Sequence, residues 1–463
     1  MKTGIMMRND HSTRVQSVGR WLAAAAMGTA FVFAVPLVTT AVEPLIGQVE
    51  LGKVAAADDA KKKQKTRRTP AIRAKIFEKL NEAQVLAEEK KYNEALNSLN
   101  ELRDKEGRGA LNSYELANLY NLYAFIYFTK EDYDNALKSY EEVIKQEDIP
   151  YAMEVNTKYT IAQLYFVKED WKKGVNTLLE WFRLKEELGE PVGANAHALL
   201  SQGYYQLKDE RKSLQHIEIA IKDYQEKGKV PKEQWWGLQR YLYFEKNDIK
   251  KVVEILEETL KYYQKKAYWQ QLAAMYGELK RDKDMVSAME TAYVQDMLDK
   301  EKELINMAYL FLSVEVPYKA AKVIDKGVKA KQIEPTSKNL ELLGNAWRQA
   351  QEIKRAIPEM AEAARKSDKG ELWARLGNIY LDNDEFEKAA DAVRAALKKG
   401  GVKRPDTAQL VLGMAEFNLK NYDSARKAFR EAKKNERSQK YAEQWIEFMD
   451  RELAREKALA KEA

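Results

Sequence analysis

The feature that most constrains the fold of this 463-residue chain is a sequence pattern that recurs about ten times. Its clearest copy lies between Trp373 and Ala396, where two apolar segments with helical spacing flank a short polar turn. A self-similar unit of this length indicates a stacked array, in which each unit buries its apolar face against its neighbours. Such arrays present long shaped surfaces, which favours a binding function over a buried reaction centre.

The copies align on one small residue, here termed the anchor, which follows a bulky residue such as Tyr92, Trp171 or Phe386 by three positions. A small anchor allows the second helix of the copy to approach the first, and the bulky residue fills the turn between them. The predicted anchors are Ala95, Ala136, Gly174, Ser213, Val252, Ala288, Ala320, Ala356, Ala389 and Ala425. They are 32 to 41 residues apart, and we expect a lengthened turn at 279–285.

This spacing and residue set resembles the tetratricopeptide repeat (TPR), a helix–turn–helix unit of about 34 residues. The resemblance implies an all-α fold, a right-handed superhelical solenoid of about ten TPR-like repeats with a C-terminal capping helix. We expect the solenoid to occupy residues 71–436 and the cap to occupy 437–463. The last segment has an apolar stripe backed by charged residues, as a helix that covers the final repeat requires.

The N-terminal residues 1–57 have the pattern of a signal peptide or a signal anchor. An uncharged stretch of 22 residues, 21–42, follows Arg8, Arg14 and Arg20. Basic residues before an apolar run favour a cleaved secretory signal. An uncleaved inner-membrane anchor is the alternative, because about 20 apolar residues span a bilayer. Both alternatives place the repeats on the translocated side, and we expect a periplasmic protein.

The net charge of +6 is concentrated before the repeats. Residues 1–57 carry a net charge of +2 and residues 58–70 carry +4, so the remainder is neutral. A neutral body lacks the electrostatic footprint of a nucleic-acid-binding protein. We interpret 58–70 as a basic flexible linker, and its alternative role is contact with lipid or peptidoglycan.

The residue types needed for catalysis are scarce. The chain has no cysteine and three histidines, of which His197 and His216 fall on the two helices of one repeat. Without a third ligand these two imidazoles make a poor metal site, so we expect them to pack between helices or lie at the surface. No glycine-rich phosphate loop or nucleophile motif is present. We therefore expect no cofactor, no metal and no enzymatic activity, and only a mechanism based on carboxylates stays open.

The resemblance implies a concave groove, lined by the first helix of each repeat, that binds peptides. By register, the groove candidates eight residues before the anchors are Phe128, Phe166, Tyr205 and Phe244. Eleven before them lie Phe125, Gln163, Gln202 and Tyr241, and Tyr159 precedes Gln163 by one turn. Aromatic rings beside amides suit an apolar, uncharged peptide segment. The same spacing also suits packing between repeats, and both interpretations stay open.

One ligand class of the family can be excluded. Repeats that clamp a C-terminal carboxylate carry a lysine four residues before a groove asparagine. Here Glu341 precedes Asn345 and Ala374 precedes Asn378, so the clamp is absent.

These features predict a non-catalytic scaffold or adaptor in the bacterial cell envelope, which binds a partner protein or peptide in its groove. The layout resembles the exported repeat proteins that accompany TonB–ExbB–ExbD systems, which implies a role in TonB-type energy transduction. The alternative is a structural envelope protein that contacts peptidoglycan or membrane through its basic N-terminal segment. A membrane contact is expected only through that segment, if it stays uncleaved.

Overall fold

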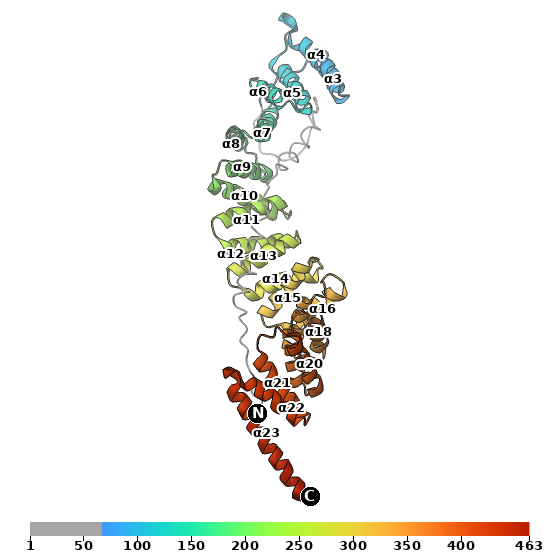
Figure 1. Cartoon of the computed structure of the whole chain (residues 1–463). Coiled ribbons are helices and arrows are strands. Elements are labelled where there is room, and N and C mark those ends of the chain that lie inside the picture. Colours follow the sequence, from blue (N-terminus) through green and yellow to red (C-terminus); the bar gives the residue numbers. More distant parts are fainter. Residues whose placement is uncertain (1–66, 463) are drawn as a thin grey trace. The chain divides into compact units, whose positions relative to one another are not determined.

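The computed structural model describes residues 67–462, and these form helices almost throughout (Figure 1). They contain 21 α-helices and no strand, which confirms the all-α prediction. In this part of the chain, no helix is both long and apolar enough to cross a membrane. The predicted signal or anchor, 1–57, and residues 58–66 of the predicted linker lie outside the described residues.

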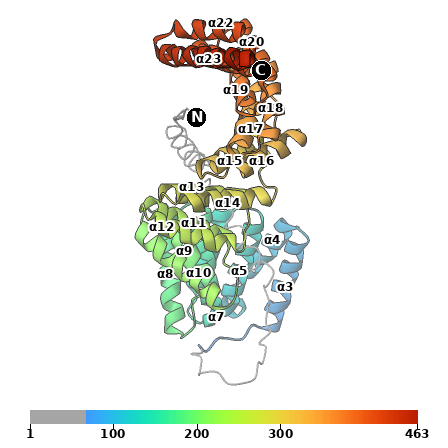
Figure 2. The same ribbon diagram turned by 90° about the horizontal axis from the view of Figure 1, so that it is seen from below.

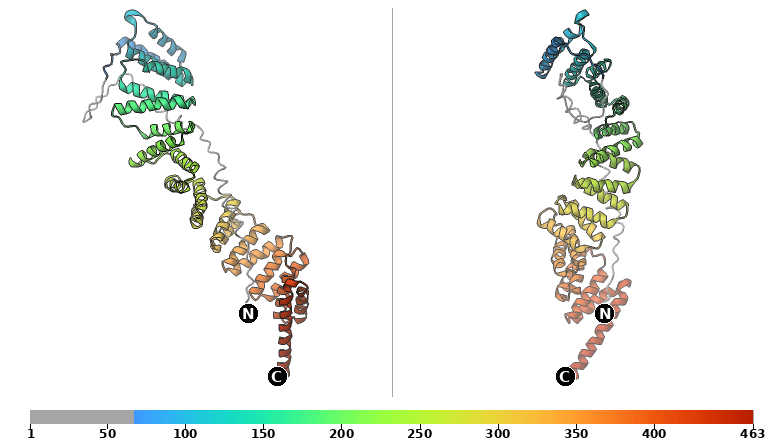
Figure 3. Two further views of the ribbon diagram at one scale, coloured as in Figure 1. Left: turned by 90° about the vertical axis from the view of Figure 1, so that its left-hand side faces the viewer. Right: turned by 180° about the vertical axis from the view of Figure 1, so that it is seen from behind.

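The described residues divide into two compact units, here termed the N-unit (67–263) and the C-unit (264–462). In both units the helices form antiparallel pairs, and the first and second members are termed the A helix and the B helix. Successive pairs of the N-unit stack as layers (Figure 3, left). Those of the C-unit follow one another along a curve (Figure 2).

The N-unit contains five pairs. Their bounds are α3 Ala74–Glu88 and α4 Tyr92–Arg103, α5 Ser113–Thr129 and α6 Tyr133–Ile144, α7 Tyr151–Val167 and α8 Trp171–Glu187, α9 Ala194–Gln206 and α10 Glu210–Glu226, and α11 Glu233–Glu245 and α12 Ile249–Leu260. A short 3-10 helix, η1 (Gly107–Gly109), precedes α5.

The C-unit contains five further pairs and one long helix. Their bounds are α13 Lys266–Glu278 and α14 Asp282–Val294, α15 Glu301–Ser313 and α16 Pro317–Lys329, α17 Ser337–Gln349 and α18 Ile353–Lys366, α19 Glu371–Asp382 and α20 Phe386–Lys399, α21 Pro405–Asn418 and α22 Tyr422–Lys433, and α23 Glu436–Glu462.

All ten pairs share one turn between the A helix and the B helix. Two positions before each B helix a residue adopts a left-handed backbone, with φ between 56° and 64°. These residues are Lys90, Glu131, Glu169, Lys208, Asn247, Lys280, Glu315, Gln351, Asp384 and Lys420. The next backbone N–H donates to the carbonyl five residues earlier, as from Asp170 to Tyr165 at 2.9 Å. This is the Schellman arrangement, and here it is formed without glycine.

Nine of the ten predicted anchors lie at the fourth residue of a B helix. The exception is Ala288, because α14 begins at Asp282 and its fourth residue is Met285. The predicted anchor is therefore wrong by one helical turn, and the turn before α14 has the ordinary length. Acidic residues in the first turn of α14 made it look like a loop, although the helix dipole favours carboxylates there.

Met285 fits as an anchor because its partner on the A helix is small. The residue eight before an anchor is usually bulky, but here it is Gly277, and a Cβ on it would lie 3.4 Å from the Met285 sulfur. At Gly174 the sizes are reversed, since a Cβ there would lie 3.2 Å from the Phe166 ring. The two positions therefore exchange volume between repeats, as close packing requires.

Glycines in the A helices of the C-unit allow close helix contact. Gly344, Gly377 and Gly413 each lie twelve residues before an anchor. A Cβ on Gly377 would lie 2.5 Å from the Val393 side chain, and one on Gly413 would lie 2.4 Å from the Phe429 ring. No larger residue fits these crossings unless the facing side chain of the B helix shifts.

The chain ends in the predicted capping helix, α23. Ala442 and Met449 on this helix are buried, and the Trp445 ring stacks on Phe429 of α22 with centroids 5.7 Å apart. The last turns of α23 run past α21 and α22, and Leu459 is exposed there (Figures 1 and 3). The first part of α23 thus covers the apolar side of the final repeat.

Two arginines fix the segment before α3 onto the N-unit. An Arg67 guanidinium nitrogen lies 3.1 Å from a Glu154 carboxylate oxygen, and its carbon lies 4.4 Å from the Tyr151 ring centroid. Arg73 donates to both carboxylate oxygens of buried Glu115, at 2.9 and 2.6 Å. Burial would raise the pKa of Glu115, but hydrogen bonds from Arg73 and Asn112 lower it. The described end of the predicted flexible linker, 67–70, therefore begins with Arg67, which is held against the N-unit.

Candidate peptide-binding surface

Each A helix has a face that lies beside its contact with its own B helix. The residue twelve before the anchor packs on the B helix, as Gly344 does against Met360. The positions 18, 15, 11 and 8 residues before each anchor follow helical spacing. They share one face of the A helix, next to the side that contacts the B helix, here termed the A-face. Of these four positions, the one at eight lies nearest the B helix. The nine predicted groove residues all belong to this face.

Two of the aromatic residues eight before the anchors have ring contacts within their own repeat. Phe128 lies 5.6 Å from Tyr133, and Phe166 lies 5.9 Å from Trp171, measured between ring centroids. Phe166 is 0% exposed, and a Cβ on Gly203 of the next repeat would lie 2.6 Å from its ring. Phe166 is therefore a core residue, and its placement in a binding groove was wrong.

The remaining predicted residues also take part in packing, to different degrees. Gln163 is buried, and Phe125 packs against the core of the first repeat. The Tyr205 and Tyr241 rings meet edge to face at 5.7 Å and join two adjacent repeats. The Tyr159 ring lies 4.8 Å from Trp181, and burial raises the pKa of Tyr159 to about 12.

Seven predicted residues keep side-chain surface in this structure. They are the half-buried residues Phe125, Phe128, Tyr159, Gln202, Tyr205, Tyr241 and Phe244. Their role in binding a peptide stays a prediction, and the structure shows that most of them also stabilise contacts within or between repeats.

Sequence reasoning missed a series of amides on the same face. Eighteen residues before four consecutive anchors lie Asn118, Asn156, Asn195 and Gln234. Asn118 is half-buried and the other three are exposed. They are separated by 38, 39 and 39 residues, as are their anchors. This recurrence is visible in the sequence, but the groove prediction considered only the aromatic positions nearer the turn.

The A-face of the N-unit carries no charged residue. Its five A helices contribute twenty positions, and all twenty are uncharged in a chain in which 32% of residues are charged. In the C-unit, five of the twenty matching positions are charged. These are Lys302, Lys338, Glu341, Arg348 and Glu371. The two units therefore present faces of different chemistry on the same backbone plan.

The two histidines of the fourth repeat form a packed pair. The Nδ1 atoms of His197 and His216 lie 3.0 Å apart, so one nitrogen donates and the other accepts. The His197 ring lies 5.0 Å from Phe182, and His216 stacks on Tyr204 at 5.7 Å. Burial lowers the pKa of both, that of His216 to about 4. This placement fits the expected packing role, and the described residues hold no cluster of three metal-ligating side chains.

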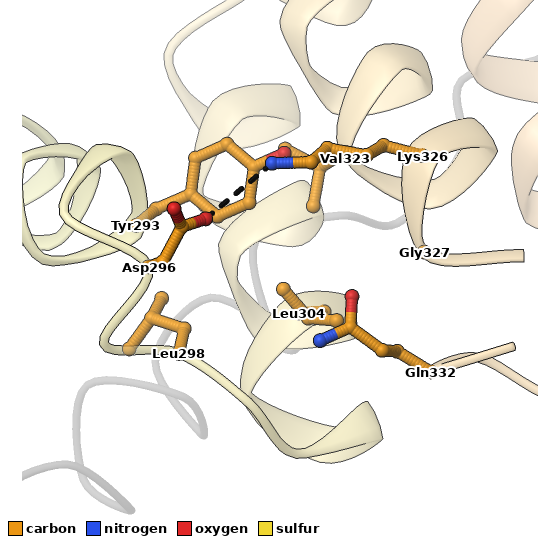
Figure 4. A pocket seen from close by; sticks show the side chains of 8 residues that line it. All are labelled: Tyr293, Asp296, Leu298, Leu304, Val323, Lys326, Gly327 and Gln332. Carbon is orange, nitrogen blue, oxygen red and sulfur yellow. Dashed lines mark hydrogen bonds and ion pairs between the residues drawn. The ribbon is translucent and has the colours of Figure 1, made fainter. Parts of the chain in front are cut away.

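A small cavity of about 40 Å³ lies between α14, α15 and α16 (Figure 4). The Lys326 amine lies 3.5 Å from an Asp296 carboxylate oxygen and 5.6 Å from the Tyr293 ring centroid. The volume of the cavity suits one or two water molecules rather than an organic ligand. It is therefore a packing defect with polar walls and not a second candidate site.

Comparison with known proteins supports the repeat assignment. Residues 117–148 and residues 374–441 each match a sequence model of the tetratricopeptide repeat. No curated protein sequence matches the chain significantly.

Solved structures with similar folds share little sequence with this chain. A crystal structure of MamA is 18% identical over 35% of this chain and 92% of its own, with a TM-score of 0.30. A tetratricopeptide repeat protein from Parabacteroides merdae is 12% identical over 55% and 94%, with a TM-score of 0.33. The Cut9–Hcn1 assembly of the APC/C is 14% identical over 82% and 91%, with a TM-score of 0.27. At these values the likenesses do not extend to function.

Repeats of this type build protein-interaction scaffolds with extended binding surfaces. The two matched segments lie in different units, and all ten helix pairs share their turn. The chain therefore contains tetratricopeptide repeats within 117–148 and 374–441, and its other helix pairs follow the same plan.

Proposed function

We propose that this protein is a non-catalytic scaffold that binds a partner protein through the A-face of its N-unit. One observation carries the proposal: fourteen of the twenty A-face positions in the N-unit keep surface, and none is charged in a chain rich in charged residues. Exposed helix surface of a soluble protein is ordinarily charged, so an uncharged face of this length favours a partner that covers it.

Site-specific crosslinking tests which face meets the partner. A photoreactive phenylalanine analogue at exposed Asn156 or Asn195 is expected to give adducts with a partner in the native host. The matched control places the analogue at Thr407, which has the same register in the C-unit. Adducts at Thr407 without adducts at either N-unit position would overturn the proposal.

We further propose that the protein acts in the bacterial envelope and supports a TonB-type energy-transduction system. The basic residues and uncharged stretch within 1–57 support export, and the layout of signal, linker and repeats supports the pathway. Deleting 1–57 should move the repeats to the cytoplasmic fraction. Co-purification with ExbB, ExbD or TonB should depend on that segment, and its absence in the wild type would contradict the pathway.

The alternative is a structural envelope protein that uses its basic segment. The observation in its favour is that four of the five residues 61–65 are lysines and closely precede Arg67, which is bound to Glu154 of α7. Deleting 58–66 leaves the Arg67 contacts intact and should release the protein from envelope fractions. Unchanged fractionation of this variant would exclude the alternative.

A further inference from the structure

We propose that the ends of the last three helix pairs form a basic surface that binds the phosphate headgroups of an anionic lipid bilayer. The surface consists of residues 365–371, 398–404 and 434–440, here termed the basic edge. Each segment lies 9 to 15 positions after its anchor, where a B helix ends and the chain passes to the next helix. All three belong to the C-unit, so the inference is independent of the A-face of the N-unit.

The basic edge is a strongly charged part of a neutral body. Residues 71–463 have no net charge, but the three segments contain ten basic residues and three acidic ones, Asp368, Glu371 and Glu436. All ten basic side chains are exposed. Clustered lysines and arginines attract anionic headgroups over a distance of about 10 Å, beyond which salt screens the charge. The charge of this edge is therefore both concentrated and accessible.

The three segments lie next to one another. The Gly370 N–H donates to the Gly400 carbonyl at 2.7 Å, which joins the first two segments. Ser438 of the third segment donates to the carboxylate of Asp406, two residues after the second segment, at 2.7 Å. The charges therefore form one surface rather than three separate patches.

Helix ends alone do not explain this charge. Cations are favourable at the C-terminus of a helix, because the helix dipole is negative there. The matching segments of the first four repeats in the N-unit contain seven basic and eight acidic residues, and they are 104–110, 145–151, 183–189 and 222–228. The excess of cations is therefore specific to the end of the C-unit, which favours an anionic ligand there.

Six cations of the basic edge make no ion pair among the described residues. They are Lys369, Lys398, Lys399, Lys403, Arg437 and Lys440. The other four are paired with carboxylates, as Arg404 is with Asp406 at 2.7 Å. Of the acids within the segments, Glu371 is held by Arg375, with 3.3 Å between nitrogen and carboxylate oxygen. The six unpaired cations can meet an external anion without losing an internal partner.

The residue types favour lipid phosphate over an acidic protein. Five of the six unpaired cations are lysines, whose compact ammonium groups bind phosphate as point charges. Lysine is depleted in protein–protein interfaces, where arginine and aromatic residues are enriched. Tyr441 follows Arg437 by one helical turn on α23 and is 59% exposed. Tyrosine is enriched at membrane interfaces, so this ring suits the same bilayer surface.

Lysine acetylation in the presence of vesicles tests the inference. The full-length protein is mixed with phosphatidylcholine vesicles, with or without about 30% phosphatidylglycerol, and mass spectrometry measures the acetylation rate of each lysine. With the anionic vesicles, Lys398, Lys399 and Lys403 should react about threefold or more slowly than with the neutral ones. Lys222 and Lys227 lie at matching positions in the N-unit, and their rates should change less than about 1.5-fold. This comparison within one molecule separates the basic edge from any lipid contact of residues 1–66.

Neutralising the middle segment tests whether the three segments act together. In the variant Lys398→Gln/Lys399→Gln/Lys403→Gln, the edge loses half of its unpaired cations and should leave the bilayer. Lys369 and Lys440, which lie on the other two segments, should then react with anionic vesicles at the rate that they show with neutral ones.

The matched control is Lys145→Gln/Lys222→Gln/Lys227→Gln, which removes the same charge from the corresponding segments of the N-unit. In this variant Lys369 and Lys440 should still react slowly with anionic vesicles. Both triple variants replace exposed residues, so circular dichroism should show unchanged melting.

Two outcomes would overturn the inference directly. One is equal reactivity of the basic edge with the two kinds of vesicle, and the other is slow reaction of Lys369 and Lys440 that persists when the middle segment is neutral. Soluble polyglutamate serves as the probe for an acidic protein. Slower reaction with polyglutamate but not with anionic vesicles would overturn the lipid and assign the basic edge to an acidic protein.

Discussion

The N-unit and the C-unit use one backbone plan for two different surfaces. Both have the left-handed turn residue and an anchor at the fourth residue of each B helix. The A-face of the C-unit carries five charged residues, whereas that of the N-unit carries none. Glycines such as Gly344 and Gly377 tighten the helix pairs of the C-unit, whereas Ser201 and Arg240 occupy this register in the N-unit. The turn and the anchor thus define the fold, and the A-face is free to vary.

The largest effect is expected from truncation of the residue eight before the anchor. Phe166→Ala removes a fully buried ring from the N-unit and should lower the free energy of unfolding by about 3–5 kcal/mol. Arg348→Ala changes the same register in the C-unit, where the side chain is exposed, and should cost less than about 0.5 kcal/mol. Urea denaturation followed by circular dichroism checks both. Equal effects would show that the two units do not differ at this position.

Glycine substitution in the A helices should have opposite signs in the two units. Gly377→Ala places a Cβ 2.5 Å from Val393 and 3.3 Å from the Ala389 carbonyl, and should destabilise the C-unit by about 1–3 kcal/mol. Gly237→Ala meets nothing within 4 Å and should stabilise the N-unit by about 0.5–1 kcal/mol through helix propensity. Thermal melts of the two variants test the pair, and a loss of stability for Gly237→Ala would contradict the open space at that position.

Histidine titration should weaken the N-unit alone, because His197 and His216 are the histidines of the described residues. The folded-state pKa values of His197 and His216 lie below the ordinary value of 6.5, that of His216 at about 4. The unfolded state therefore binds more protons, so stability is complete above about pH 6.5 and falls as the pH drops towards 4. Asp223 opposes this shift at His197, whereas Lys212 adds to it at His216.

The expected loss is about 1 kcal/mol after allowance for partial exposure. Proteolysis of the N-unit between pH 7 and pH 4.5, with cleavage sites read by mass spectrometry, measures it. The variant His197→Asn/His216→Asn removes both titrating groups and should flatten the pH profile. A profile that is unchanged in this variant would assign the acid sensitivity to carboxylates.

The smallest effect is expected at the shared turn, and it should be alike in the two units. Lys208 in the N-unit and Lys420 in the C-unit have φ values of 63° and 61°. Replacing either with glycine relieves the left-handed conformation and should stabilise its unit by roughly 0.5–1 kcal/mol. A β-branched residue, as in Lys208→Val or Lys420→Val, should destabilise instead. Differential scanning calorimetry that shows opposite signs at the two sites would break the structural equivalence of the turns.

Sequence reasoning succeeded where a local rule sets the structure. Nine anchors could be placed because a small residue after a bulky one recurs at repeat spacing. Sequence reasoning failed at Met285, where the anchor is large and the small partner, Gly277, lies on the A helix. The shared turn could not be recognised from glycine, since all ten left-handed residues are other types. Its fixed backbone geometry emerges only when the two helices pack.

The candidate peptide-binding surface shows the same contrast between what local rules predict and what tertiary packing decides. Register counting placed the nine predicted residues on one helix face, because helical spacing is a local property. It could not separate Phe166, which is buried under the next repeat, from Tyr205, which keeps exposed surface. The amide series was visible in the spacing of Asn118, Asn156 and Asn195, and its exposure came from the structure.

From its residues alone, this chain is an array of about ten helix pairs with a cap, because apolar periodicity and anchor spacing are encoded in each copy. Tertiary structure decided which aromatic rings pack and which stay accessible, since Phe166 is buried by its own B helix and the following repeat, whereas Tyr205 in the same register keeps surface. It also separated the N-unit from the C-unit. Local sequence rules describe one repeat, whereas exposure depends on the neighbours of that repeat.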